Sequence, residues 1–289
     1  MYGSNTSYDV YPSIDLSNPA LSLTGRVAII TGAGRGIGGK GIVPAFARAG
    51  PRGLVLVGTK RDALRTVEAA VREINPAVET LVVAANIADA AWVARLFAEV
   101  ATTFGHADIL VNNGGVNTGG GFLDEEDTEA WWQNFEVNTK GAFLLAREFL
   151  RSLPSPASTP ATLVNLASTG AWQVYPTMSG YSLSKLAALQ LTAHVAAAYP
   201  HVTAVVLRPG LVETDMLLDA FRRFSLYSPA LIGGVAVWLA AERPRFLSGR
   251  TIVANWDLHD LQKRAAEIEG GGLLKIDRQG EFGKGPFSS

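Results

Sequence analysis

The segment VAIITGAGRGIG, residues 27–38, decides the fold of this chain. Its first five residues form an apolar run typical of a strand buried on both faces of a parallel sheet. Four glycines then occupy alternate positions before a helical segment begins. Glycine permits a turn with positive φ and a close approach of the backbone to a pyrophosphate, which the helix N-terminus attracts. We therefore predict a dinucleotide-binding turn made of Gly32, Gly34, Arg35, Gly36, Ile37 and Gly38.

Strands and helices alternate along the rest of the chain. The predicted strands are residues 27–31, 54–58, 80–84, 109–112, 162–165, 202–207 and 251–254. The predicted helices are residues 61–74, 89–104, 128–150, 181–199 and 229–241. This alternation implies right-handed crossovers. It predicts an α/β, Rossmann-type doubly wound fold with a seven-stranded parallel sheet, helices on both faces and a single domain.

This pattern predicts that the chain is divided into three parts. Residues 1–23 form an N-terminal arm that either orders on contact or stays loose, residues 24–256 form the Rossmann domain, and residues 257–289 form a helical extension and tail. The helix after Gly38 begins irregularly, because two glycines and Pro44 are poor helix formers. Pro44 must lie in the first turn, or the helix starts late or carries a bulge.

The composition excludes several classes of protein. Among 289 residues, 25 are Lys or Arg and 26 are Asp or Glu, and this balance argues against a nucleic-acid binder. The chain has no Cys, which excludes disulfides, thiolate metal sites and a cysteine nucleophile, and no metal site is predicted. The charge-free stretch 186–207 is interrupted by Pro200 and His201, so it is read as a buried helix and strand rather than a membrane span. With no secretory signal at the N-terminus, we expect a cytoplasmic protein.

The end of the second predicted strand indicates which dinucleotide binds. An acidic residue about 20 residues after the glycines would bind the ribose hydroxyls of NAD. Position 59 is Thr, and Lys60 and Arg61 follow, whereas the first acid, Asp62, is expected to cap the next helix. A threonine and two cations, with Arg35 as a third, favour the 2′-phosphate of NADP(H) over solvated helix-start residues.

Tyr181 and Lys185 are the candidates for proton transfer. Four residues apart on a helix, they share one face. A nearby ammonium favours a phenolate, so we expect Lys185 to lower the pKa of Tyr181 from about 10 towards neutrality. Such a tyrosine can exchange a proton at physiological pH. The hydroxyl of Ser168, after the fifth strand, can hold a substrate oxygen near it.

The pattern as a whole resembles the short-chain dehydrogenases/reductases, specifically NADP-preferring fungal members with an extended C-terminus. The resemblance covers residues 24–252 and rests on motifs that occur in the family's order and spacing. These are residues 31–38, Asn112-Asn113-Gly114-Gly115, Asn138, Ser168, Tyr181, Lys185 and residues 208–214. The third position of the Asn-Asn motif is usually Ala in the family, and the extended end is similar to fungal members from secondary metabolism.

The resemblance implies roles for these positions. Tyr181 would be the general acid, Lys185 would lower its pKa and bind the nicotinamide ribose, and Ser168 would orient the carbonyl. Asn138 would hold a water that links Lys185 to solvent. The implied cofactor contacts beyond the glycine turn and Thr59, Lys60 and Arg61 are Asn86, Ile87, Asn112, Gly114, Tyr181, Lys185, Pro209, Gly210, Val212 and Thr214. Asn86 replaces the Asp that the family usually places beside adenine.

The expected substrate is a bulky, largely apolar carbonyl compound or secondary alcohol, because aromatic and apolar residues follow the catalytic ones. The candidate substrate-binding residues are Ser168, Trp172, Tyr175, Met178, Tyr181, Leu217 and Phe221. The predicted activity is that of an NADP-dependent ketoreductase, in either direction. The alternatives are a non-redox enzyme of the same fold (cyclase, isomerase or dehydratase) and a dinucleotide-sensing binding protein. The family implies a homodimer or homotetramer built on helices 128–150 and 181–199, with Phe143, Leu144, Ala187 and Leu191 as candidate contacts.

Overall fold

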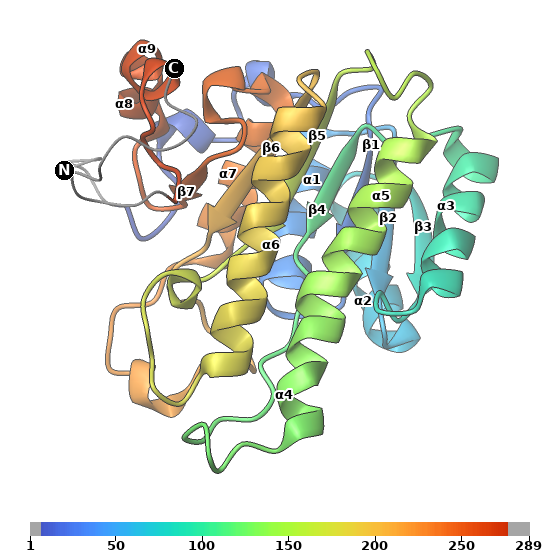
Figure 1. Ribbon diagram of the computed structural model, residues 1–289. Helices are drawn as coiled ribbons and strands as arrows, with labels where there is room; N and C mark the ends of the chain where they lie inside the picture. Colours follow the sequence, from blue (N-terminus) through green and yellow to red (C-terminus); the bar gives the residue numbers. More distant parts are fainter. Residues whose placement is uncertain (1–6, 277–289) are drawn as a thin grey trace.

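Seven parallel strands form one sheet in the computed structural model, which describes residues 7–276 apart from the side chain of Ala220 (Figure 1). The strands are β1 (Val27–Thr31), β2 (Gly53–Gly58), β3 (Glu79–Ala84), β4 (Ile109–Asn112), β5 (Ala161–Leu166), β6 (Val202–Arg208) and β7 (Thr251–Val253). Their spatial order is β3-β2-β1-β4-β5-β6-β7. The predicted doubly wound fold is confirmed. The order reverses between β1 and β4, which is where such sheets bind ligands.

Helices cover both faces of the sheet (Figure 1). They are α1 (Val43–Ala49), α2 (Arg61–Ile74), α3 (Ala90–Phe104), α4 (Thr128–Asn134), α5 (Ala142–Ser152), α6 (Ser179–Ala198), α7 (Pro229–Glu242), α8 (Leu258–Lys263) and α9 (Ala265–Gly270). On one face lie α1, α2 and α7, and on the other α3, α5 and α6. Each face of the sheet has its own hydrophobic core. Ala28 and Ile30 of β1 are buried in the core under α1, α2 and α7, and Val27 and Ile29 are buried in the core under α3, α5 and α6. This double burial explains why the strand is uniformly apolar.

Two π-helical turns interrupt the helices beside the carboxyl edge of the sheet. The first, Gly38–Ile42, joins the glycine turn to α1, and Pro44 lies in the first turn of α1, so the expected irregularity is confirmed. The second, Phe135–Gly141, joins α4 to α5, where the sequence predicted an uninterrupted helix. Single π turns of this kind are often associated with functional sites.

Both terminal segments pack on the core within the described residues. Residues 7–23 place Ile14, Leu21 and Leu23 against α7, although residues 1–6 of the predicted arm lie outside the described part. At the other end, Leu258 and Ile268 are buried in the same core, so of the two surfaces expected for this amphipathic segment, its own subunit or a neighbour, it packs on its own. The predicted tail beyond residue 276 likewise lies outside the residues that the structure describes.

One helix-surface expectation is wrong. Phe143 is 45% exposed, but Leu144 is only 4% exposed because it faces the core under α5. The charge-free stretch forms part of α6 and then β6, as predicted. Across residues 7–276, none of the helices combines the length and apolarity needed to span a bilayer.

Candidate active site

The glycine turn between β1 and α1 is closely packed backbone. Gly32 and Gly36 have φ of +64° and +53°, which other residues rarely adopt. A Cβ on Gly38 would collide with the carbonyl oxygen of Gly32, and a Cβ on Gly34 would lie 3.3 Å from that of Ala63. The turn therefore presents backbone N–H groups with no side chain in front of them, as a pyrophosphate requires.

The end of β4 fixes the shape of this turn. The Thr31 hydroxyl accepts hydrogen bonds from the backbone N–H groups of Asn113 (3.1 Å) and Gly114 (2.9 Å). The Asn113 side chain donates to the Thr31 carbonyl at 2.8 Å. Sequence reasoning did not assign these roles to Thr31 and Asn113. The signal was present, because a hydroxyl residue ends one strand and an Asn-Asn pair ends its neighbour.

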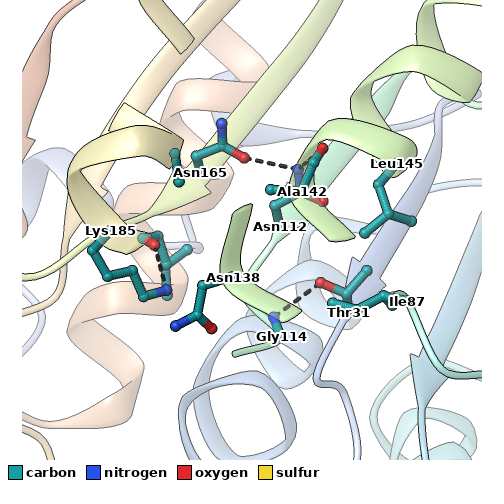
Figure 2. Close-up of a pocket in the computed structure, with 11 residues that line it drawn as sticks. Thr31, Ile87, Asn112, Gly114, Asn138, Ala142, Leu145, Asn165 and Lys185 are labelled. Atoms are coloured by element: carbon teal, nitrogen blue, oxygen red, sulfur yellow. Dashed lines mark hydrogen bonds between the residues drawn. The ribbon is translucent and has the colours of Figure 1, made fainter. Parts of the chain in front are cut away.

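Asn112 lies behind the site rather than at its surface. Its Nδ2 donates to Oδ1 of Asn165 at 2.8 Å, and Asn165 donates to Thr192 on α6 at 2.7 Å. A small cavity separates this chain of polar groups from Lys185 and Asn138 (Figure 2). Within the described residues, Oδ1 of Asn112 has no hydrogen-bond partner, so the cavity has a polar wall.

The π turn Phe135–Gly141 carries Asn138 into the site. Its Oδ1 accepts from the Val116 N–H at 2.9 Å, and its Nδ2 donates to the Val116 carbonyl at 2.9 Å and the Ser184 hydroxyl at 3.0 Å. Ser184 in turn donates to the Tyr181 carbonyl at 2.7 Å. Asn138 thereby ties the loop after β4 to the first turns of α6. Ser184 is a positioning residue that sequence reasoning missed.

Ser168, Tyr181 and Lys185 come together at the carboxyl edge of β5. The Tyr181 side chain is hydrogen-bonded to Ser168. Lys185 is 6% exposed, and its Nζ donates to the Leu166 carbonyl at 3.1 Å and lies 5.9 Å from the Tyr181 ring centre. A Cβ on Gly115 would lie 2.9 Å from Oδ1 of Asn138 and 3.2 Å from Nζ of Lys185. All four predicted catalytic side chains are thus neighbours.

The electrostatics of the pair differ from the expectation. Burial raises the pKa of Tyr181, and the Ser168 hydrogen bond only partly opposes this shift. Burial also lowers the pKa of Lys185 to about 8. The prediction that Lys185 lowers the pKa of Tyr181 is therefore wrong for this structure, because loss of hydration outweighs the attraction of an ammonium bonded to a carbonyl.

The predicted 2′-phosphate site is an open surface after β2. Thr59, Lys60 and Arg61 are all exposed, and no carboxylate of the described residues pairs with either cation. Asp62 does not cap α2, since Lys60 is the N-cap and no side chain caps the helix. Arg35 instead bonds to Asp215 at 2.7 Å.

Asn86 and Ile87 follow β3 with different surroundings. Asn86 is exposed, and its side chain accepts a local bond from Ala88 at 3.0 Å. Ile87 lines the small cavity and packs beside Gly114 and Gly141.

The segment after β6 lies beside the glycine turn. Thr214 approaches Gly36, where an added Cβ would be 3.3 Å from its methyl group. Gly210 has φ of +79° and is in contact with the ring of Tyr227, which also bridges to Val212. Thr214 is therefore beside the glycine turn, and Pro209, Gly210 and Val212 precede it on the same segment; their role in cofactor binding stays a prediction.

Two largely exposed segments follow Ser168 and Thr214 along the chain, and we call residues 169–178 and 215–227 the substrate rim. Tyr175 and Phe221 meet across it, with ring centres 6.2 Å apart. Trp172 is 43% exposed, Met178 is at the start of α6, and Leu217 donates its N–H to the Thr214 carbonyl. Among the predicted substrate-binding residues, Tyr175 thus meets Phe221 across the rim and Tyr181 meets Ser168, while the substrate-binding role of the set stays a prediction.

No cluster of three or more His, Cys, Asp or Glu residues that could hold a metal occurs between residues 7 and 276. The polar groups at the site are a hydroxyl, a phenol, an ammonium and an amide. Such a set can hold a carbonyl oxygen and exchange a proton with it.

Comparison with known proteins agrees with this geometry. Residues 26–223 match the family model for short chain dehydrogenases. The short chain dehydrogenase mpl6 of Monascus purpureus is 36% identical over 283 residues, which covers 94% of each chain. The short chain dehydrogenase andI of Emericella variicolor is 36% identical over 260 residues, covering 87% of this chain and 89% of that protein.

Solved structures share the architecture. A gluconate 5-dehydrogenase from Burkholderia cenocepacia J2315, in complex with NADP and tartrate, superposes with a TM-score of 0.71 at 26% identity, over 81% of this chain and 95% of that one. A putative short-chain alcohol dehydrogenase from Sinorhizobium meliloti 1021 gives 0.73 at 28% identity, over 82% and 97%. With a matching family model, fungal relatives across almost its whole length and the same sheet, this chain belongs to the short-chain dehydrogenase family.

Proposed function

We propose that this oxidoreductase is an NADP(H)-dependent ketoreductase that interconverts a carbonyl and a secondary alcohol, with Tyr181 as general acid and base. The observation that carries the proposal is the grouping of Ser168, Tyr181, Lys185 and Asn138 beside the glycine turn. The turn fits a dinucleotide because the space that side chains would fill at Gly32 and Gly38 is taken up by backbone. A bound nicotinamide would supply or accept the hydride.

The residues of the chain supply placement and the proton. The Ser168 hydroxyl and the Tyr181 phenol both reach one carbonyl oxygen. The raised pKa of Tyr181 keeps its proton in place at neutral pH, so the phenol is ready to donate in the reductive direction. The Lys185 ammonium, held by Leu166, would bind the nicotinamide ribose and replace the proton through Asn138 and a water.

Replacement of Tyr181 by Phe tests the role of the phenol. Tyr181→Phe should abolish NADPH oxidation with an active ketone and leave NADPH affinity within about two-fold, because only the proton donor is lost. Absorbance at the reduced nicotinamide band measures turnover, and calorimetry measures binding. The matched control is Tyr199→Phe. Tyr199 is the C-cap residue at the opposite end of α6 from Tyr181, so this variant should retain activity. Turnover by Tyr181→Phe would remove the proposed acid.

The same assay separates the alternatives. A cyclase, isomerase or dehydratase of this family would form product without oxidising NADPH. A sensing protein would bind NADPH tightly and turn over nothing across a broad panel of carbonyl compounds. Either outcome for the wild-type protein would replace the proposed reaction while leaving the family unchanged.

The preference for NADP(H) is supported by the surface after β2. Lys60 and Arg61 are exposed, and neither is paired with a carboxylate of residues 7–276, so both can turn to a 2′-phosphate. The double variant Lys60→Ala/Arg61→Ala should raise the Kd for NADPH about 10- to 100-fold and leave that for NADH unchanged, because charge-assisted bonds to phosphate are lost. Arg48→Ala, an exposed cation at the end of α1, is the control. Equal losses for NADH and NADPH would contradict the assignment.

The substrate class and assembly are also proposals. Exposed apolar residues of the substrate rim favour a bulky, largely apolar ketone or alcohol, and the fungal relatives favour a role in secondary metabolism. The family and the exposed Phe143 on α5 favour a homodimer or homotetramer. A cytoplasmic location stays a prediction from the sequence.

A further inference from the structure

Arg208 is a cation beside the substrate rim that pairs with no carboxylate in the described part of the chain. It ends β6, directly before Pro209 and Gly210. Its Nε is buried and has no hydrogen-bond partner within residues 7–276, and no ion pair involves its guanidinium there. A buried charged donor left in this state is costly, and native proteins keep few such groups.

Three other arginines of this chain donate hydrogen bonds to backbone carbonyls. Arg250, 6% exposed, donates to the carbonyls of Ile268 (2.8 Å) and Leu273 (3.2 Å). Arg26 donates to carbonyls at the end of α7, and Arg52 donates to the Phe104 carbonyl at 2.7 Å. Arg243 also has a buried Nε without a hydrogen-bond partner within residues 7–276, but the Asp108 carboxylate is close enough to act on its charge, whereas the neighbours of Arg208 are aromatic.

The surroundings of Arg208 are aromatic. Its guanidinium lies 5.9 Å from the ring centre of Trp172 on the substrate rim. Tyr175 and Tyr227, from the two segments of the rim, are close enough to act on its charge. Burial lowers the pKa of Arg208, yet a guanidinium keeps its proton in proteins. A fixed positive charge thus lies beside the aromatic side chains of the rim.

We propose that Arg208 recognises a carboxylate carried by the substrate, at a distance from the carbonyl that Ser168 and Tyr181 hold. The planar guanidinium matches a carboxylate with two parallel hydrogen bonds. Trp172 and Tyr175 flank this contact and would partly shield it from water, which strengthens it. This inference rests on the proposed ketoreductase function and narrows its substrates from apolar ketones to apolar keto acids.

A set of matched ketones tests the preference. The probes are the ortho, meta and para acetylbenzoic acids and their methyl esters, so that the spacing between carbonyl and carboxylate varies while the ring is constant. Wild-type protein should reduce one acid with a higher kcat/KM than its ester. Arg208→Gln should lower kcat/KM for that acid about 10- to 100-fold, mainly through KM, and leave the ester within about two-fold. Arg208→Lys keeps the positive charge but cannot form two parallel hydrogen bonds. Its kcat/KM for the acid should therefore lie between those of the wild type and Arg208→Gln.

A control variant separates this site from the general charge of the rim. Arg222 is exposed and already paired with Glu213 and Asp219, so Arg222→Gln should not change the preference for acid over ester. Equal loss for acid and ester in Arg208→Gln, or no loss for the acid, would overturn the proposal. NADPH binding by each variant verifies that it is folded.

A binding measurement keeps this inference distinct from the reaction itself. Calorimetry on the NADP⁺ complex should show that benzoate binds more tightly than the neutral analogue benzamide. Arg208→Gln should remove this difference in affinity. Tyr181→Phe should retain it, because the phenol does not contact the carboxylate. If benzoate and benzamide bind equally, Arg208 is not an anion site even if the enzyme reduces ketones. If the difference persists without any turnover, it is the proposed reaction that fails.

Discussion

The cofactor side and the substrate rim of this site are built in opposite ways. The cofactor side, residues 31–38 and 112–115, is backbone packed on backbone, and a single added Cβ at Gly38 meets the main chain. The rim consists of side chains that the rest of the protein leaves uncovered, with Val174 91% exposed and Phe224 49% exposed. The fold therefore fixes the shape of the cofactor side. It does not require the particular side chains of the rim. Changes on the two sides should have different consequences for stability and specificity.

The largest effect should come from filling the cofactor side. Gly38→Ala forces a methyl group against the Gly32 carbonyl and the Asn113 amide, so it should cost about 1–3 kcal/mol of stability and remove measurable NADPH binding. Thermal unfolding and calorimetry measure the two effects. Gly270→Ala, at a position with nothing within 4 Å of the new Cβ, is the control and should do neither. Normal cofactor binding by Gly38→Ala would show that the turn is not rigid.

The next effect concerns the charge where the two sides meet. Because the pKa of Lys185 is about 8, the ammonium is charged below that pH and neutral above it. The kcat/KM for NADPH at saturating ketone, which reports the free enzyme, should therefore fall about ten-fold per pH unit above about 8. In Lys185→Arg the charge persists, so the fall should move to higher pH. The same inflection in both proteins would assign it to another group.

A smaller effect is expected from the rim itself. Val174→Ser removes an exposed methyl surface, so the stability should change by less than about 0.5 kcal/mol. The KM for apolar ketones should rise a few-fold while the Kd for NADPH stays the same. Unfolding curves and steady-state kinetics test both parts. A changed Kd for NADPH would mean that the rim and the cofactor side are not independent.

The smallest effect should come from the exposed ion pair that joins the two sides. Asp215→Asn frees Arg35 for the 2′-phosphate, so the KM for NADPH should fall by at most about five-fold and that for NADH should not change. Because both groups are exposed, added salt should erase the difference. A gain that survives high salt would point to a rearranged loop instead.

Sequence reasoning predicted the fold well because the strands are buried on both faces. A strand such as β1 has no polar face, so its boundaries coincide with the end of an apolar run. The glycine turn was equally readable, since its shape allows no other residue at Gly38. The catalytic grouping came from spacing and resemblance, and the structure places those residues together.

The remainder depends on tertiary surroundings that no local pattern encodes. The direction of the pKa shift of Tyr181 depends on how much water the fold removes, which neither Tyr181 nor Lys185 reveals. The core position of Leu144 follows from the rotation of α5 after the π turn. Arg208 reads like any strand-end arginine until its neighbours are known.

The π turn Phe135–Gly141 determines how this chain tolerates a change of length. A π turn holds more residues than an α-helical turn, so removing Val137 would allow residues 128–152 to continue as a regular helix with its backbone hydrogen bonds intact. Each residue of an α-helix turns it by about 100°, so α4 and α5 would lose their present relative orientation. Asn134 could then not reach Thr118 while Leu144 and Phe149 remain in the core. Residues 128–152 could therefore lose one residue and remain helical. The loop after β4 would then lose the hydrogen bond from Asn134 to the Thr118 carbonyl.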